Sequence, residues 1–223
     1  MQVTNIYDHY HVPPILRTHM YSVAALAMHV INNLSHPIDT ANTHLVVQAC
    51  LLHDVGNIVK FDLDNSDLLI KEDAASLSKL KEEFAQRFGA DDHEATIAML
   101  KELNVSQEVL DVLIPSRTME EAFQRLKSDA RFGYYFYADF RVAPTGVVSL
   151  DDRVDELLAR YRGRDGYLWA DKERAEASRV LMKAHEHTLQ KQTTIDIASI
   201  CNEDIAVTSQ SLFSYPIDLN PVL

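Results

Sequence analysis

Apolar residues repeat every three or four positions near the start of this chain, which is the spacing of one buried face of an α-helix. The repeat runs from about residue 15 to residue 34, where a Ser-His-Pro segment ends it. Its apolar positions are Leu16, Met20, Val23, Ala27, Val30 and Leu34. A second helix is expected over about 39–54, with Gly56 supplying the turn that follows.

The same periodicity predicts helices along the rest of the chain. The expected ranges are about 68–88, 91–100, 106–113, 119–127, 131–141, 149–161 and 171–191. Asp91 and Ser149 are expected to be N-caps, and Gly146 to lie in a turn. The range 131–141 is rich in aromatic residues, but the spacing of its apolar positions favours a helix over a strand. Glycine and proline are scarce, at 6 and 7 of 223 residues, which also favours helices.

These patterns predict an all-α fold: a single-domain helical bundle with an extended C-terminal tail. A polar lead covers residues 1–14, the helical core covers 15–162, and a C-terminal helix and tail over 163–223 pack on that core. From residue 192 onward there is no Lys or Arg. We expect this tail to cover an apolar surface, either of its own chain or of a second copy in a homodimer.

Composition excludes several classes of protein. The net charge of −12 argues against binding of long nucleic acids, but a locally positive pocket could still bind a small anionic substrate. Two cysteines, Cys50 and Cys201, are too few for a disulfide framework or a thiolate zinc site. The N-terminal sequence lacks the layout of a signal peptide, and no apolar run is long enough to span a membrane. The expected location is the cytoplasm, with no membrane partner.

Three ionisable side chains fall on the apolar faces of three predicted helices. His19, His53 and Asp139 are each three or four residues from apolar positions, so each is expected to point inward. A lone inward histidine is more often a core residue than a ligand, but a buried carboxylate is costly unless it is paired or bound to metal. One metal ion held by these residues and Asp54 would explain why all of these ionisable side chains point inward. Two imidazoles and two carboxylates suit Mn²⁺, Fe²⁺, Co²⁺, Ni²⁺ or Zn²⁺, and Mg²⁺ less well.

The sequence around these residues resembles a known family. RTHMYSVA, LLHDVGN and YADFRVAPTGVVSL follow one another with separations of 34 and 85 residues between the key positions. Their order, spacing and context resemble the H…HD…D signature of HD-superfamily metal-dependent phosphohydrolases, over roughly residues 15–162. The resemblance implies an HD-type helical bundle around one or two metal ions, with His19, His53, Asp54 and Asp139 as ligands. It also implies hydrolysis of a phosphate ester, in a small phosphorylated metabolite or nucleotide, by metal-activated water.

Two arginines lie two residues from predicted ligands. A guanidinium group suits a phosphate, so Arg17 and Arg141 are expected to act in catalysis together with Asp54. Arg17, Arg141 and Asn57 are all expected to contact the substrate. Surface salt bridges are the alternative for both arginines.

The chain departs from the family at one catalytic position. Members that act on nucleoside monophosphates carry a glutamate three residues after the HD aspartate, where this chain has Asn57. Glu72 and Asp73 are candidates for a displaced base.

Two alternative functions stay open at this point. A di-iron oxygenase of the HD type would need two further histidines between Asp54 and Asp139, and the chain has one, His93. His93 shares a helix face with apolar residues, so it is expected to point inward, as a ligand of a second ion, as support for the first, or as a core histidine. A non-catalytic module that senses a nucleotide, with a structural metal, is the other alternative. His185 and His187 are expected to be surface residues.

Overall fold

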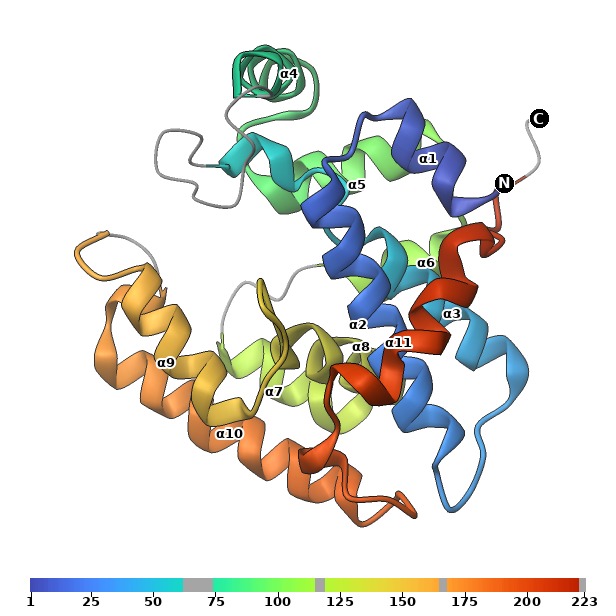
Figure 1. Cartoon of the computed structure of the whole chain (residues 1–223), viewed down its shortest axis with the longest axis vertical. Helices are drawn as coiled ribbons and strands as arrows, with labels where there is room; N and C mark the ends of the chain where they lie inside the picture. The colour runs from blue at the N-terminus through green and yellow to red at the C-terminus, as the bar shows by residue number, and fades with distance from the viewer. Residues whose placement is uncertain (62–73, 115–118, 165–167, 221–223) are drawn as a thin grey trace.

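The computed structural model describes residues 1–61, 74–114, 119–164 and 168–220. Within them the fold is a mostly helical single domain with eleven α-helices and one small hairpin (Figure 1). The first six helices are α1 (Val3–His9), α2 (Pro14–Asn32), α3 (Thr40–Leu52), α4 (Ala74–Phe88), α5 (Asp92–Glu102) and α6 (Gln107–Leu113). The others are α7 (Met119–Ser128), α8 (Ala130–Arg141), α9 (Leu150–Arg160), α10 (Lys172–Gln190) and α11 (Asn202–Ser211).

Short elements join these helices. The 3₁₀ turns are η1 (Asn57–Lys60), η3 (Leu168–Ala170), η4 (Ile197–Ser199) and η5 (Leu212–Ser214), and the hairpin strands are β1 (Val142–Ala143) and β2 (Gly146–Val147). Of the helices described, none is long and apolar enough to cross a membrane.

Helix α2 lies at the centre of the domain, where α3, α8 and α11 pack against it (Figure 1). All the apolar positions predicted for its inner face are buried, and Ala24, Ala25 and Leu26 between them are buried as well. Helix α3 is buried from Val46 to its end at Leu52. Helices buried on most sides form the core of a domain rather than its surface layer. The two central helices therefore hold the side chains they carry in fixed positions.

The helical ranges predicted from the sequence are confirmed wherever the structure describes them. The range 131–141 is helix α8 and not a strand. The carboxylate of Asp91 accepts hydrogen bonds from two amides in the first turn of α5, at 3.0 and 2.9 Å. Ser149 Oγ accepts one from the Asp152 amide at 3.1 Å. Residues 68–73 of the predicted range 68–88 lie outside the described residues.

The N-terminal lead contains a helix that the sequence pattern did not predict. Helix α1 buries Val3, Ile6 and Tyr7 against the core. The Tyr7 hydroxyl donates a 2.6 Å hydrogen bond to the carbonyl of Leu51 in α3. Four of its seven residues are polar, so its small apolar face does not stand out in the sequence.

The C-terminal segment corrects the prediction of an extended tail. It contains helix α11, which packs on α2, and only its last part is extended. There the Val3 amide donates to the Tyr215 carbonyl at 3.0 Å, and the Ile217 amide donates to the Met1 carbonyl at 2.7 Å. The tail therefore covers a surface of its own chain. Helix α11 was missed because Ile205 is its one buried residue, so it has no apolar stripe.

The turn expected at Gly146 is a tight hairpin. Gly146 has φ of +110°, a conformation that side chains disfavour, and a Cβ atom there would lie 2.3 Å from the Asn202 side chain. Asn202 Oδ1 accepts a 2.8 Å hydrogen bond from the Val147 amide. Through this hydrogen bond the hairpin, which follows α8 in the chain, contacts the start of α11.

Arg141 is a buried structural residue and not a substrate contact. Its side chain is 1% exposed. The guanidinium donates to the carbonyls of Ile197 (2.9 Å), Ala198 (3.3 Å) and Ile200 (3.1 Å), and to that of Val148. It also donates to the Tyr137 hydroxyl at 2.6 Å and to Glu186 of α10 at 3.3 Å. With these donors engaged, Arg141 is not free to bind a phosphate, which corrects the role predicted for it.

This buried arginine leads to a prediction about stability. Arg141→Met should lower the free energy of unfolding by ~3–5 kcal/mol, because it leaves several carbonyls in the interior without their donor and removes one partner of the partly buried Glu186. Arg131→Met, on the same helix, removes a partly exposed guanidinium and should cost less than ~1 kcal/mol. Urea denaturation of the two variants measures both effects. Equal losses would show that Arg141 does not hold the C-terminal segment.

Candidate metal centre

Four side chains from three parts of the chain converge beside the centre of the domain. His19 comes from the second turn of α2, His53 and Asp54 follow the last turn of α3, and Asp139 lies near the end of α8. We call these four residues the metal centre, as the candidate position for a metal ion. His19 Nε2 lies 3.3 Å from His53 Nε2 and 3.2 Å from Asp139 Oδ1, and His53 Nε2 lies 3.3 Å from that same oxygen. Asp54 Oδ2 lies 3.8 and 3.7 Å from the two ring nitrogens.

The separations among His19, His53 and Asp139 fit the ligand sphere of one metal ion, and those from the imidazoles to Asp54 are slightly longer. His and carboxylate ligands bind transition metals at ~2.0–2.2 Å, which places neighbouring ligand atoms about 3–3.6 Å apart. Within the described ranges, His19, His53 and Asp54 form a group whose ligand atoms lie within 4.8 Å of one another, and no second such group occurs there. Asp139 adds a fourth ligand atom next to both imidazoles. The donor set is the one that suits Mn²⁺, Fe²⁺, Co²⁺, Ni²⁺ or Zn²⁺.

The metal centre is open on one side. The His53 side chain is 3% exposed, whereas the Asp139 side chain is 31% exposed. His19 and Asp54 have intermediate exposure. Solvent therefore reaches this group of residues at Asp139, whereas His53 is enclosed.

Charge at the metal centre favours a cation. Burial opposes protonation of His53, but the carboxylates of Asp54 and Asp139 outweigh it and raise the pKa of the imidazole to about 9. Burial likewise opposes ionisation of Asp54 and Asp139, but the neighbouring imidazoles lower the pKa of each carboxyl. A point that attracts a proton so strongly also attracts a metal ion, which competes for the same ligand atoms.

Local structure fixes the ligands. His53 Nδ1 donates a 2.8 Å hydrogen bond to the Cys50 carbonyl, which directs Nε2 toward the metal centre. Asn57 Nδ2 donates to Asp54 Oδ2 at 2.7 Å. The Asn57 side chain, predicted to contact substrate, therefore positions the Asp54 carboxylate. Its Oδ1 is buried and has no hydrogen-bond partner among the described residues.

Gly56 allows the His53-Asp54 turn to approach α5 closely. Its φ of −91° is ordinary, so no special turn conformation requires glycine there. A Cβ atom would lie 2.5 Å from the Thr96 amide nitrogen, and the Gly56 amide donates to Thr96 Oγ1 at 3.1 Å. Gly56 lies in the turn predicted from the sequence, but glycine is required there because the turn packs closely on Thr96 and not because of its backbone conformation.

Arg17 and His93, both predicted to act at the metal centre, have other surroundings in the structure. The Arg17 guanidinium donates to Asp8 (2.6 Å) and to the carbonyls of Val12 (2.7 Å) and Tyr7 (3.1 Å), so it fastens α1 to α2. His93 is exposed on the first turn of α5, which corrects the prediction that it points inward. Glu72 and Asp73, the candidates for a displaced base, lie outside the described residues.

The structure adds residues that the sequence analysis missed. Lys60 forms an ion pair with Asp92 of α5, and its charge helps to lower the pKa of Asp54. Tyr135 lies one turn before Asp139, with its ring centre 5.6 Å from that of His53. A signal for Lys60 was present: Asp54, Asn57 and Lys60 are spaced by three, which is the period of a 3₁₀ helix.

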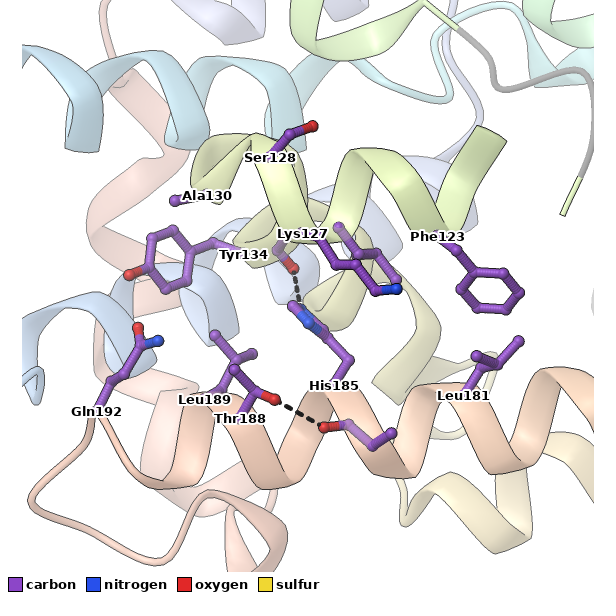
Figure 2. Close-up of a pocket in the computed structure, with 13 residues that line it drawn as sticks. Phe123, Lys127, Ser128, Ala130, Tyr134, Leu181, His185, Thr188, Leu189 and Gln192 are labelled. Atoms are coloured by element: carbon purple, nitrogen blue, oxygen red, sulfur yellow. Dashed lines mark hydrogen bonds between the residues drawn. The ribbon is translucent and has the colours of Figure 1, made fainter. Parts of the chain in front are cut away.

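A separate groove lies between α7, α8 and α10. It has a volume of about 450 Å³, and apolar side chains such as Phe123 and Leu181 line it together with His185 (Figure 2). His185 Nε2 donates to the Gly133 carbonyl at 3.1 Å, so this histidine is half-buried, contrary to the expectation of a surface residue. His187 is exposed, as expected. No residue of the metal centre lines this groove.

Comparisons with protein-family models, curated proteins and solved structures gave no match to this chain. The chemistry of the metal centre is therefore inferred from its side chains.

The geometry predicts that the chain binds about one divalent ion. Manganese at ~100 times its Kd should raise the free energy of unfolding of the wild-type chain by about 2.7 kcal/mol. His53→Ala removes the most buried ligand, so bound manganese and this stabilisation should both disappear. His93→Ala, which removes an exposed histidine, should match wild type. Elemental analysis and thermal unfolding measure these effects, and wild-type manganese content in His53→Ala would contradict the assignment.

Proposed function

We propose that this chain is a metal-dependent hydrolase of phosphate esters with an HD-type helical core. The observation that carries the proposal is that two imidazole nitrogens lie 3.3 Å apart, and that two carboxylates each lie 3.2–3.8 Å from both of them. These residues occur along the chain in the order H…HD…D, which supports the resemblance to HD-superfamily phosphohydrolases. The helices that carry them, α2, α3 and α8, pack directly on one another, as a bundle around a central ion requires.

A divalent ion held by these ligands would make a hydroxide available near neutral pH and offset charge on phosphoryl oxygens. The chain's own residues would hold the geometry: His53 is oriented by the Cys50 carbonyl, and Asp54 by the Asn57 amide. The partial exposure of Asp139 leaves a side of the metal centre accessible to substrate. A structural metal site is normally closed by its protein ligands, so this accessibility favours an enzyme over a sensing module with a structural metal.

One ion is better supported than two. A di-iron oxygenase would need further histidine ligands, and His93, the candidate for that role, points into solvent. The described residues also contain one candidate metal-binding group and no second. These observations favour hydrolysis over oxygen chemistry.

The substrate is proposed to be a small molecule with a phosphate ester. The net charge of −12 disfavours long polyanions such as nucleic acids. A phosphate ester matches the chemistry of a divalent ion with an accessible side, because the ion can bind a phosphoryl oxygen.

The proposed activity has a direct test. Purified chain with Mn²⁺, Co²⁺, Ni²⁺ or Mg²⁺ should hydrolyse p-nitrophenyl phosphate or a member of a nucleotide and sugar-phosphate panel, EDTA should abolish this, and added metal should restore it. Asp54→Ala should lose both the bound metal and the activity, because it removes a ligand. Asp111→Ala, an exposed aspartate of α6, is the matched control and should retain both.

Three results would each count against the proposal. Activity that survives chelation would exclude a role for the metal, and full activity in Asp54→Ala would exclude the ligand set. Turnover that depends on oxygen would favour the oxygenase instead.

A further inference from the structure

Lys60 lies on the same face of the chain as the metal ligand Asp54. Residues 57–60 form the 3₁₀ turn η1, which directly follows the His53-Asp54 turn. Side chains three residues apart on such a turn eclipse one another, so Asp54, Asn57 and Lys60 line one side of it. The 2.7 Å hydrogen bond from Asn57 to Asp54 shows this alignment for the first pair. Lys60 continues the row, one turn further from the metal centre.

Asp92 fixes the position of the Lys60 ammonium group. The two side chains form an ion pair through Lys60 Nζ and Asp92 Oδ2. Asp92 is the first residue of α5 and its side chain is 13% exposed, so its position is set by the packing of α5 on η1. The Lys60 side chain is 37% exposed, so solvent reaches the ammonium. An ammonium has three donors, and Asp92 Oδ2 accepts one; among the described residues no other acceptor of Lys60 occurs, so two donors are available to another anion.

The charge of Lys60 acts on the metal centre itself. Burial opposes the charged form of Lys60, but Asp54 and Asp92 outweigh it and raise the pKa of the ammonium. In turn, Lys60 is one of the groups that lower the pKa of Asp54. Lys60 is therefore a cation within electrostatic range of a metal ligand. The two arginines predicted for this role, Arg17 and Arg141, are engaged by carbonyls and carboxylates elsewhere.

We propose that Lys60, held in place by Asp92, binds the phosphoryl group of the substrate beside the metal centre. This inference rests on the proposed function and names its phosphate-binding residue. The ammonium offers a positive charge and N–H donors to a phosphoryl oxygen next to the position proposed for the ion.

The test compares binding of inorganic phosphate to the full-length, manganese-loaded chain and its variants. Lys60→Gln should weaken phosphate binding by ~10- to 100-fold, the effect of losing a hydrogen bond to a charged group. The KM for p-nitrophenyl phosphate should rise by a similar factor while kcat changes less, and manganese content should equal that of wild type. Lys60→Arg keeps the charge and should restore much of the affinity.

Lys183→Gln is the matched control. Lys183 is half-exposed and pairs with Asp151 of another helix at 2.7 Å, so this variant removes the same charge and the same kind of ion pair. It should bind phosphate as wild type does. If Lys60 were only a tether between η1 and α5, Lys60→Gln would lower stability and leave phosphate affinity unchanged, which would overturn the proposal. A wild-type chain that binds manganese but no phosphate would instead refute the proposed hydrolase, and the inference with it.

Discussion

Two carboxylates and two imidazoles meet at the junction of α2, α3 and α8. The rest of the structure depends on this group, because ionisable side chains in a helical core must be held in place and their charges balanced. Asp54 and Asp139 are held near His19 and His53 at distances too short for independent, solvated charges. Placing such groups in a core is costly unless a cation balances them. A metal ion is the balance we propose, because ligand atoms of His19, His53 and Asp54 lie within 4.8 Å of one another and Asp139 lies next to both imidazoles.

The surrounding structure fixes those positions from several directions. The buried central helices hold His19 and His53, and Gly56 lets the turn after His53 pack directly on α5. Helix α8 carries Asp139 and, two residues later, Arg141, whose guanidinium binds the C-terminal segment. One helix thus joins the metal centre to the part of the chain that is most distant from it in sequence.

Much of this could be predicted from the sequence, and the failures have physical causes. The longer helices were predictable because their apolar stripes repeat several times, and the metal residues because ionisable side chains fall on those stripes. Helices α1 and α11 are short and bury few residues, so they leave little periodic signal.

Roles that depend on tertiary contacts were harder to predict. Arg17 and Arg141 lie near ligands in sequence, but their guanidinium groups bind backbone carbonyls that no local pattern reveals. His93 was expected to point inward because it shares a helical face with apolar residues, yet it lies on the first turn of α5, where that face still meets solvent. Lys60 is hard to predict from α-helical periodicity because its turn has the three-residue period of a 3₁₀ helix.

The central claim is that one divalent ion is bound by His19, His53, Asp54 and Asp139. Anomalous diffraction at the manganese edge, from crystals of the full-length chain grown with Mn²⁺, tests it most directly. The account predicts one strong peak within ~2.0–2.3 Å of both Nε2 atoms and of an oxygen from each carboxylate. A map with no peak there, or with manganese only at exposed acidic side chains such as Asp151 and Asp155, would contradict it.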